Sequence, residues 1–393
     1  MRKIADATMK LGASLGVRAT VFPHWGELTV RIEDAAGPHL ESIAVEPSGV
    51  DMNKVVATMD VIDQVHNQCM EATAARSALD AINRFPPVAL VRFALFAGAG
   101  AAALGVIFGE SHVLSLFLIA LSAGAGACLR RWLAAKSKNL FVQPFCAAIL
   151  AGMVGAIAVR LQLSSTLVAV CPCMVLVPGP HLLNGALDLA RARIILGIAR
   201  VSYASLVILM ICAGLVLGLA LGGVSLPVSV PSNQVPLWYD VPAAGLAVAA
   251  FGSFFNMPWR MLPIPILVGM LAHAGRWMVM SLAGAGAAIG ALAACLTVGI
   301  IMTPVANRLR LPFAGVAFAS VVSLMPGVFL FRMAAGMVEI VTRDQQTPPE
   351  LLVQVTADGL TALLIVLAMA FGLIIPKMVI DHFTRSPLSA TDK

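Results

Sequence analysis

Two short stretches of the chain place polar side chains soon after a Pro-Gly pair in otherwise apolar sequence. The first, VLVPGPHLLNGALDL (175–189), has Pro178 and Gly179 ahead of Asn184 and Asp188. Proline lacks a backbone N–H and glycine loses the most conformational entropy, so neither favours a continuous helix. We therefore predict a helix that breaks and restarts here, with a carboxamide and a carboxylate just beyond the break.

A second stretch repeats this arrangement with two charged residues. SLMPGVFLFRMAAGMVEI (323–340) contains Pro326 and Gly327, followed by Arg332 and Glu339. The two charged residues are seven positions apart and share one face of a helix. They are candidate substrate-binding or coupling residues. The alternative is a surface helix with an exposed ion pair, which stabilises little.

A break at membrane depth exposes backbone groups that can bind a ligand. Lipid offers no hydrogen bonds, so such a break persists only against protein or a water-filled cavity. Free N–H groups of a helix restarting at about His181 would suit a carboxylate, and free carbonyls of the preceding segment would suit an ammonium group. Together they complement a zwitterion, the form of an amino acid at neutral pH.

Asn184 and Asp188 are four residues apart and therefore also share a helical face. Asn184 could hydrogen-bond a polar substrate, and Asp188 could bind its amine or carry a coupling proton, because an ionisable residue inside a membrane segment suggests function. The alternative is an amphipathic surface helix over 181–200, which Arg191 and Arg193 favour.

The composition predicts a helical protein that crosses a membrane many times. Of its 393 residues, 59% are hydrophobic and 12% are charged, against roughly 25% charged in ordinary soluble domains. Several apolar runs approach the ~20 residues that span a bilayer. Ten such segments lie near 88–108, 113–129, 140–159, 161–177, 201–221, 241–255, 261–275, 278–303, 311–327 and 358–376. We predict an α-helical polytopic membrane protein with about ten transmembrane helices.

The first 86 residues predict a separate small α/β domain. Residues 1–86 carry 8 Lys/Arg and 11 Asp/Glu, which leaves 26 − 8 = 18 and 20 − 11 = 9 for residues 87–393. An apolar stripe predicts one long helix from about Asp51 to Arg84. β-branched runs predict strands near 17–25, 27–34 and 43–47. Without a nucleophile, phosphate-loop or metal motif, we expect neither catalysis nor a cofactor nor a metal in this domain.

The two halves of the membrane part resemble one another. RLQL (160–163) begins 178 − 160 = 18 residues before Pro178, and RLRL (308–311) begins 326 − 308 = 18 residues before Pro326, an offset of 148. Five segments per half is an odd number, so the halves would be inserted in opposite directions. Inverted repeats with paired breaks are typical of secondary transporters and indicate the binding site. A chance similarity of short apolar motifs is the alternative. The predicted parts are 1–86 (domain), 87–221 (first five-helix repeat), 222–240 (periplasmic loop) and 241–393 (second repeat and tail).

The basic residues indicate how the protein is oriented. With the N-terminal domain in the cytoplasm, fourteen of the eighteen Lys/Arg in the membrane part fall inside, as the positive-inside rule expects. Asp6 and Lys10 interrupt the apolar core that a cleaved signal needs. We expect a multi-pass protein of a bacterial inner membrane whose basic excess sets topology, with lipid rather than nucleic acid as its partner.

These motifs resemble those of the threonine/serine exporter family of bacteria and fungi. The similarity lies in VPGPHLLNGALDL with the following Gly197 and Arg200, in FNMPWRMLPIPILVGMLAHAGRWM (255–278) and in SLMPGVFLFRMAAG (323–336); VRATVFPHWGELTV in the N-terminal domain adds to it. The resemblance implies a ten-helix inner-membrane exporter of threonine and serine driven by the proton gradient. By matching position it implies roles for Pro178, Gly179, Asn184, Asp188, Pro326 and Gly327.

Two other motifs have simpler explanations. GAGAAALG (98–105) imitates a dinucleotide fingerprint, but no strand precedes it, so we interpret it as close helix packing. CPC (171–173) lacks the spacing of a redox or metal pair, and we interpret it as packing too.

We therefore predict a transporter rather than an enzyme. The transporter would work by alternating access without a cofactor or metal, and it could form a homodimer through glycine-lined helices. A membrane-embedded hydrolase would need a nucleophile with a base, which the scattered histidines do not supply in the sequence. A channel or sensor gated by the cytoplasmic domain remains the main alternative.

Overall fold

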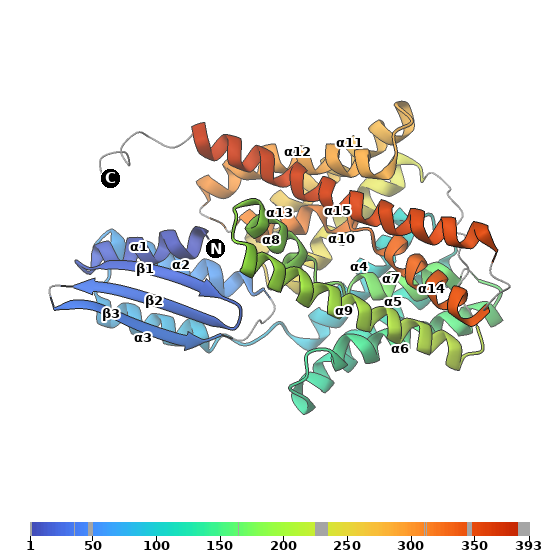
Figure 1. Ribbon diagram of the computed structural model, residues 1–393, viewed down its shortest axis with the longest axis horizontal. Helices are drawn as coiled ribbons and strands as arrows, with labels where there is room; N and C mark the ends of the chain where they lie inside the picture. Colours follow the sequence, from blue (N-terminus) through green and yellow to red (C-terminus); the bar gives the residue numbers. More distant parts are fainter. Residues whose placement is uncertain are drawn as a thin grey trace.

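The computed structural model describes residues 2–34, 36–45, 50–163, 165–224, 235–309, 311, 313–343 and 348–383. Its N-terminal part is a small α/β domain at one end of the molecule (Figure 1). The antiparallel sheet has the order β1-β2-β3, with strands β1 (Arg18–His24), β2 (Glu27–Asp34) and β3 (Gly37–Ala44). The helices of this domain are α1 (Arg2–Ser14), α2 (Met52–His66) and α3 (Ala72–Asn83).

The third strand begins earlier than predicted. Gly37 pairs with Asp34, so the chain reverses directly after β2. The Asp34 carboxylate accepts hydrogen bonds from the N–H groups of Ala36 and Gly37 at 2.8 and 3.1 Å, and Gly37 has a φ of 124° that favours glycine. This tight turn places the strand at Gly37–Ala44 rather than at 43–47, of which 46 and 47 lie outside the described residues.

The single helix predicted from Asp51 to Arg84 is in fact two helices. α2 ends where Gln68 adopts a φ of 58° and the Cys69 N–H donates to the Gln64 carbonyl. The chain then reverses, which lets α3 fold back on α2. The two helices share a small apolar core of Val61, Val65, Ala75 and Ile82.

The rest of the chain consists of apolar helices. Eight described helices are long and apolar enough to cross a membrane, and two bent pairs raise the number of candidate spans to ten. The long helices are α4 (Leu90–Ile107), α5 (Val113–Lys136), α6 (Val142–Arg160), α9 (Ile194–Leu221), α10 (Leu237–Phe254), α11 (Pro263–Leu282), α12 (Ala287–Arg308) and α15 (Pro349–Phe383). The bent pairs are α7 (Ser165–Met174) with α8 (Gly179–Ala190), and α13 (Phe313–Val321) and η2 (Val322–Leu324) with α14 (Gly327–Arg343). The prediction of a helical polytopic membrane protein with about ten spans is confirmed.

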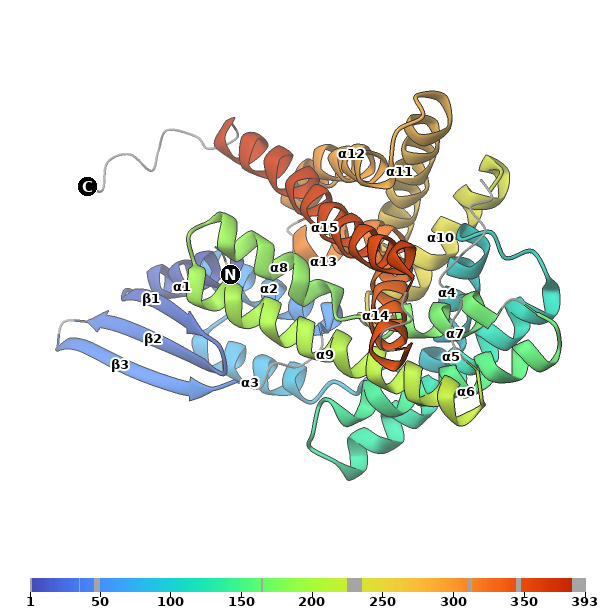
Figure 2. The same cartoon turned by 45° about the vertical axis from the view of Figure 1, so that its right-hand side comes forward.

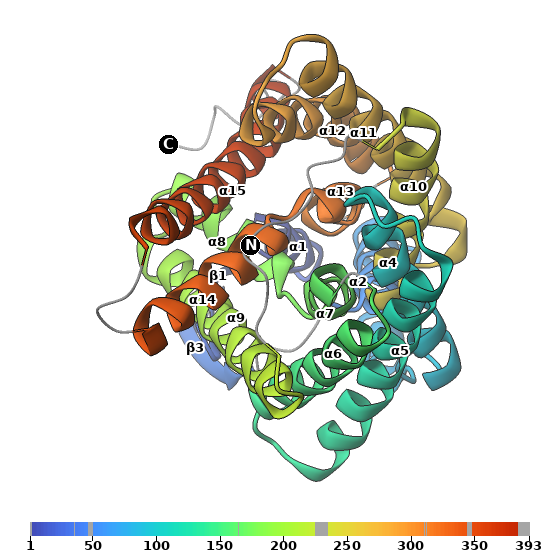
Figure 3. The ribbon, with the colours of Figure 1, turned by 90° about the vertical axis from the view of Figure 1, so that its right-hand side faces the viewer.

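The long helices surround the broken ones. In Figure 3, which looks along the bundle, α7 and α13 lie inside a ring of long helices. Every residue of α7 is buried. In contrast, large apolar side chains of the long helices face outward, among them Leu95, Ile195 and Leu221. Exposed apolar surface of this extent is typical of a membrane-facing protein.

The main helix pairings of the first half recur in the second. α4 packs on α5, α5 on α6, α6 on α9 and α8 on α9; correspondingly, α10 packs on α11, α11 on α12, α12 on α15 and α14 on α15. Figures 1 and 2 place α8 beside the N-terminal domain and α14 toward the opposite end of the bundle, called here the far end. These pairings are those expected of a repeat; the inversion of the two halves stays a prediction.

Glycines let these helices approach closely. A Cβ atom on Gly98 would lie 2.7 Å from the carbonyl oxygen of Ala120, and one on Gly100 would lie 2.8 Å from Ala250 Cβ. The glycine run 98–105 therefore packs α4 against α5 and α10, as predicted.

The N-terminal domain is fixed to the membrane part through the start of α2. Asp51 caps α2 and also accepts hydrogen bonds from Asn256 Nδ2 at 3.2 and 3.1 Å. The Met52 N–H donates to the Phe255 carbonyl at 2.7 Å, and the Met52 side chain is buried against Gly315. The domain therefore covers the end of the bundle at which α8 and α13 lie.

Candidate functional site

The first Pro-Gly break is a tight backbone turn between α7 and α8. Pro178 has φ −80° and ψ 60°, and the Gly179 N–H donates to the Val177 carbonyl at 2.8 Å. These values define an inverse γ-turn, and the two helices meet at a bend of 59°. The predicted break is present. It arises because Pro178 cannot donate a hydrogen bond to the preceding turn.

The second break has the same hydrogen bond. The Gly327 N–H donates to the Met325 carbonyl at 2.8 Å, and the bend is 55°. Donor and acceptor are displaced from those of the first break by 327 − 179 = 148 and 325 − 177 = 148 residues. The offset seen in the sequence is therefore also the offset of the backbone geometry at the two breaks.

The expectation of free N–H groups at the start of α8 is wrong. α8 begins at Gly179 rather than at about His181. The N–H groups of His181 and Leu182 both donate to the Pro178 carbonyl, at 3.0 and 3.4 Å, and Pro180 has no N–H. The tight turn thus satisfies the amides that were expected to bind a carboxylate.

The two breaks pack on each other's halves. A Cβ atom on Gly179 would overlap the ring of Phe318 on α13, and one on Gly327 would lie 2.6 Å from Met174 Cγ on α7. Each break glycine therefore packs on the helix that precedes the other break. Pro178, Gly179, Pro326 and Gly327, all predicted site residues, lie at this crossing of the two halves.

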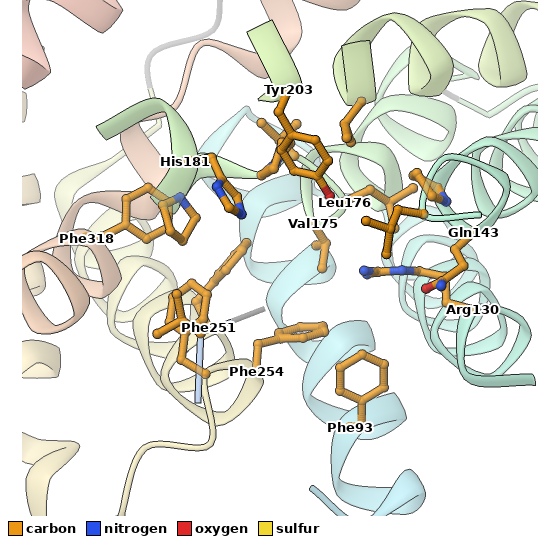
Figure 4. Close-up of a pocket in the computed structure, with 18 residues that line it drawn as sticks. Phe93, Arg130, Gln143, Val175, Leu176, His181, Tyr203, Phe251, Phe254 and Phe318 are labelled. Atoms are coloured by element: carbon orange, nitrogen blue, oxygen red, sulfur yellow. The ribbon is translucent and has the colours of Figure 1, made fainter. Parts of the chain in front are cut away.

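A cavity of about 330 Å³, the inner cavity, lies against the first break. Val175, Leu176, Val177 and Pro178 form part of its wall, so the residues of the first break border it. Its volume is at the lower end of the range for small-molecule pockets. Figure 4 shows the aromatic side of this cavity, with Phe93, Phe251, Phe254 and Phe318.

Polar side chains line the inner cavity from different helices, among them Gln143 of α6. Figure 4 shows Arg130 of α5, His181 of α8 and Tyr203 of α9 converging on it. Among the described residues, neither Arg130 Nε nor His181 Nδ1 has a hydrogen-bond partner. A guanidinium in such a place suits a carboxylate, and phenol and imidazole suit hydroxyl or ammonium groups. Arg130, His181 and Tyr203 could not be identified as site residues from the sequence, because each stands alone in an apolar or basic stretch.

A second cavity of about 580 Å³, the outer cavity, lies between the N-terminal domain and the membrane part. Side chains of α1 and α2 line one wall, and Asn184 and Arg200 lie on another. The outer cavity shares Val50, Pro180 and Phe255 with the inner cavity, so these residues separate the two spaces. Asn184, a predicted site residue, faces this outer space rather than the inner cavity.

Trp25, in the turn between β1 and β2, contacts residues that line the inner cavity. Its ring lies 5.9 Å from the ring of His181 and 5.4 Å from that of Tyr203, measured between centroids. A side chain of the N-terminal domain is therefore part of the surroundings of the membrane site.

Asp188 is buried, which excludes the predicted alternative of a surface helix at this position. Its side chain is 5% exposed and pairs with Arg200 Nε of α9 at 3.3 Å and with Arg193 Nη1 at 3.9 Å. Because Arg200 lines the outer cavity, Asp188 lies directly behind a cavity-facing cation. This ion pair joins α8 to α9.

Arg332 makes the corresponding ion pair in the second half. Its Nε lies 3.1 Å from Asp358 Oδ2 of α15, with side chains 15% and 7% exposed. In both halves the ion pair joins the helix after the break to the next long helix. The order along the chain differs, because the carboxylate, Asp188, comes first in the first half and the guanidinium, Arg332, comes first in the second. Glu339, the other predicted residue, lies half-buried further along α14. Asp358 was missed because the apolar segment was predicted to begin at that residue.

A further polar group was also missed. Asp240, His273 and Ser323 come together in the second half, although they lie far apart in the sequence. CPC, by contrast, is fully enclosed, with Cys171 and Cys173 both buried and not in disulfides, as a packing role predicts.

The fold and the paired breaks define a polytopic membrane protein built around two broken helices. Comparison with protein families agrees: residues 1–222 match the family described as "Putative threonine/serine exporter" and residues 240–379 match "Threonine/Serine exporter, ThrE". The chain belongs to the threonine/serine exporter family.

Individual relatives are more distant. The chain is 26% identical over 272 residues to pheromone-regulated membrane protein 10 of Candida albicans (strain WO-1), covering 65% of this chain and 22% of that protein. The same protein of strain SC5314 / ATCC MYA-2876 gives the same values. This chain thus spans about a fifth of the length of these curated relatives. No solved structure matches the chain.

Proposed function

We propose that this protein is a secondary transporter that exports threonine and serine in exchange for protons. The observation that carries the proposal is the inner cavity, which Arg130, Tyr203 and His181 line together with residues of the first break. A cation for a carboxylate, together with a phenol and an imidazole for hydroxyl and ammonium groups, suits a small hydroxylated amino acid. Family membership supports a membrane exporter rather than an enzyme.

The proposed path begins at the outer cavity. Arg200 and Asn184 line that cavity and would attract the substrate carboxylate first. The substrate would then pass the wall formed by Pro180 and Phe255 and bind at Arg130. Asp188 would hold Arg200 in place and, when Arg200 engages a carboxylate, would be the partner for the substrate amine or a proton.

Alternating access would involve movement of the two helices that follow the breaks, each of which carries one of the buried ion pairs. Both cavities adjoin the N-terminal domain or the helix ends near it, so this state would be open on that side, which we propose is the cytoplasm of a bacterial inner membrane. Movement of α8 and α14 about Gly179 and Gly327 would close it and open the far end. Arg332 and Asp358, and Glu339 further along α14, would then bind substrate or a proton at the far end. Asp188 and Arg200 would do so at the end beside the N-terminal domain. The scheme applies equally to a single chain and to a homodimer.

Flux in proteoliposomes tests the proposal. Labelled threonine and serine should move saturably with an imposed pH gradient, and alanine and lysine serve as controls. Replacing Arg130 by Gln should raise KM by roughly 10- to 100-fold, the value of a lost hydrogen bond to a charged group. Arg131→Gln is the matched control, because Arg131 donates to the Val88 carbonyl instead of lining the cavity. Gradient-independent, non-saturating flux would favour a channel, and absence of flux in folded protein would withdraw the substrate.

A further inference from the structure

Three buried polar side chains form a continuous chain in the second half. His273 of α11 lies with Nδ1 3.1 Å from Asp240 Oδ2 of α10 and with Nε2 2.6 Å from Ser323 Oγ of η2. Their exposed fractions are 0%, 3% and 2% for His273, Asp240 and Ser323. Ionisable side chains inside a membrane bundle are costly and rare, and those that occur usually mark a functional site.

The chain connects the far end to the second break. Asp240 lies in the first turn of α10, next to the exposed rings of Trp238 and Tyr239. Ser323 lies three residues before Pro326, in the short helix whose end leads directly into the break. A proton that moved along these three residues would therefore pass from near the far surface to the crossing of the two broken helices.

The same three residue types form the catalytic group of serine hydrolases, in which serine must reach a substrate. Ser323 is buried and lines neither the inner nor the outer cavity. Neither of these two cavities therefore offers an acyl substrate access to the Ser323 hydroxyl. A proton, in contrast, can be transferred between hydrogen-bonded atoms without such a space. The arrangement thus favours proton binding over acyl transfer.

Two charged side chains of opposite sign lie near His273. On α11 itself, Arg276 lies one turn further along, within electrostatic range of Asp240. The titratable side chains described on the other elements packed against α11 are Asp240 and Tyr239 on α10, Cys295 and Arg308 on α12 and Arg260 on η1, and α13 has none. Cys295 packs against Gly372 of α15, Tyr239 and Arg260 are exposed, and Arg308 ends α12. Asp240 and Arg276 are thus the charges placed to act on His273, and their charges offset one another.

Protonation would reverse one hydrogen bond beside the break. A neutral imidazole that donates Nδ1–H to Asp240 accepts at Nε2 from the Ser323 hydroxyl. After a proton binds at Nε2, both ring nitrogens donate, and the serine hydroxyl turns its hydrogen to another acceptor. When the proton leaves, the first arrangement returns, so no group other than the proton is consumed or released.

We propose that Asp240, His273 and Ser323 form a proton-binding site whose state is transmitted to the Pro326–Gly327 break. The coupling of this site to export rests on the function proposed above. It adds proton binding at the second break to the amino-acid binding proposed at the first.

Gradient-driven and exchange fluxes separate coupling from substrate binding. In proteoliposomes, His273→Gln should lose threonine accumulation driven by a pH gradient but keep threonine–threonine exchange, because exchange needs no net proton movement. His112→Gln is the control, since His112 is an exposed histidine just before α5. If His273→Gln accumulates threonine as the wild type does, His273 does not carry the coupling proton.

A second measurement does not depend on any substrate. In full-length protein with labelled histidines, the ring-nitrogen NMR signal of His273 is the one that is absent in His273→Gln. This signal should change with pH while the protein stays folded, and it should move in Asp240→Asn. A His273 signal that never changes with pH would overturn the site, whatever the flux results. A titrating signal without threonine or serine flux would instead keep the site and reject the proposed function. If His273→Gln does not fold, Ser323→Ala, which keeps the imidazole, should still titrate but lose accumulation; unchanged accumulation would contradict the proposal.

Discussion

Gly179 lies against the ring of Phe318 so closely that no side chain fits between them. The two residues belong to different halves: Gly179 starts the helix after the first break, and Phe318 lies on the helix before the second. The reciprocal contact, Gly327 against Met174, has the same form. The crossing of the broken helices therefore depends on two positions at which a Cβ atom would force the facing side chain to move.

Gly179→Ala should destabilise the protein and abolish transport. Its methyl group must displace the Phe318 ring, and overpacking of this kind costs about 1–3 kcal/mol. Thermal unfolding in detergent and threonine flux would measure the two effects. Phe318→Leu should partly restore the stability of Gly179→Ala by making room. Gly275→Ala is the control, because a Cβ atom there meets nothing within 4 Å. Equal stability of the Gly179 and Gly275 variants would refute the close contact.

Asp188→Asn should lower the stability and stop gradient-driven flux. It leaves Arg200 largely buried without its carboxylate, and breaking a buried ion pair costs about 3–5 kcal/mol. The double variant with Arg200→Gln should recover much of the stability but not the flux, because the largely buried cation is then removed and the other partner, Arg193, is 38% exposed. Chemical unfolding of the four proteins gives the coupling energy.

The exposed pair of Arg31 and Glu33 on β2 provides the comparison for this cycle. Their side chains are 47% and 37% exposed, and such pairs contribute about 0–1 kcal/mol. A coupling energy for Asp188 and Arg200 as small as that of Arg31 and Glu33 would show that the buried pair does not hold α8 to α9.

Cysteine labelling tests the inverted arrangement of the halves. In a background without the seven native cysteines, Leu189→Cys at the end of α8 and Val341→Cys on α14 should react with impermeant reagents from opposite sides. Both positions are exposed, at 40% and 80%. Leu140→Cys should react on the side of Leu189, and Leu282→Cys on the side of Val341. Reaction of Leu189 and Val341 from one side would reject the inversion.

Much of the fold was predictable because local physics determined it. Apolar length identified the spanning segments, and the two Pro-Gly pairs marked both breaks, since proline removes the same hydrogen bond in any context. The split between α2 and α3 was not predictable, because a non-glycine residue, Gln68, adopts the left-handed conformation there. Nothing in its residue type announces that turn.

The site was predictable only in part. Residues next to a break, such as Asn184 and Asp188, could be found because the break itself drew attention to them. Arg130 and His273 lie within ordinary apolar helices, and their importance depends on what another helix brings to face them. The free amides expected at the restart of α8 do not exist, since the N–H groups of His181 and Leu182 donate to the Pro178 carbonyl. An ion pair between two helices, such as that of Arg332 with Asp358, can be identified only once the packing of the helices is known.

The crossed packing of Gly179 on Phe318 and Gly327 on Met174 also bears on how the protein is assembled. The break in each half packs on a helix of the other half, so neither half alone contains all the contacts that its own broken helix makes. The two family matches, 1–222 and 240–379, divide the chain between these halves. Where such halves are made as separate polypeptides, the packing contacts at the breaks would form only when the two chains associate. A half without its partner would expose the surface on which the other break packs, and cellular quality control could recognise that surface.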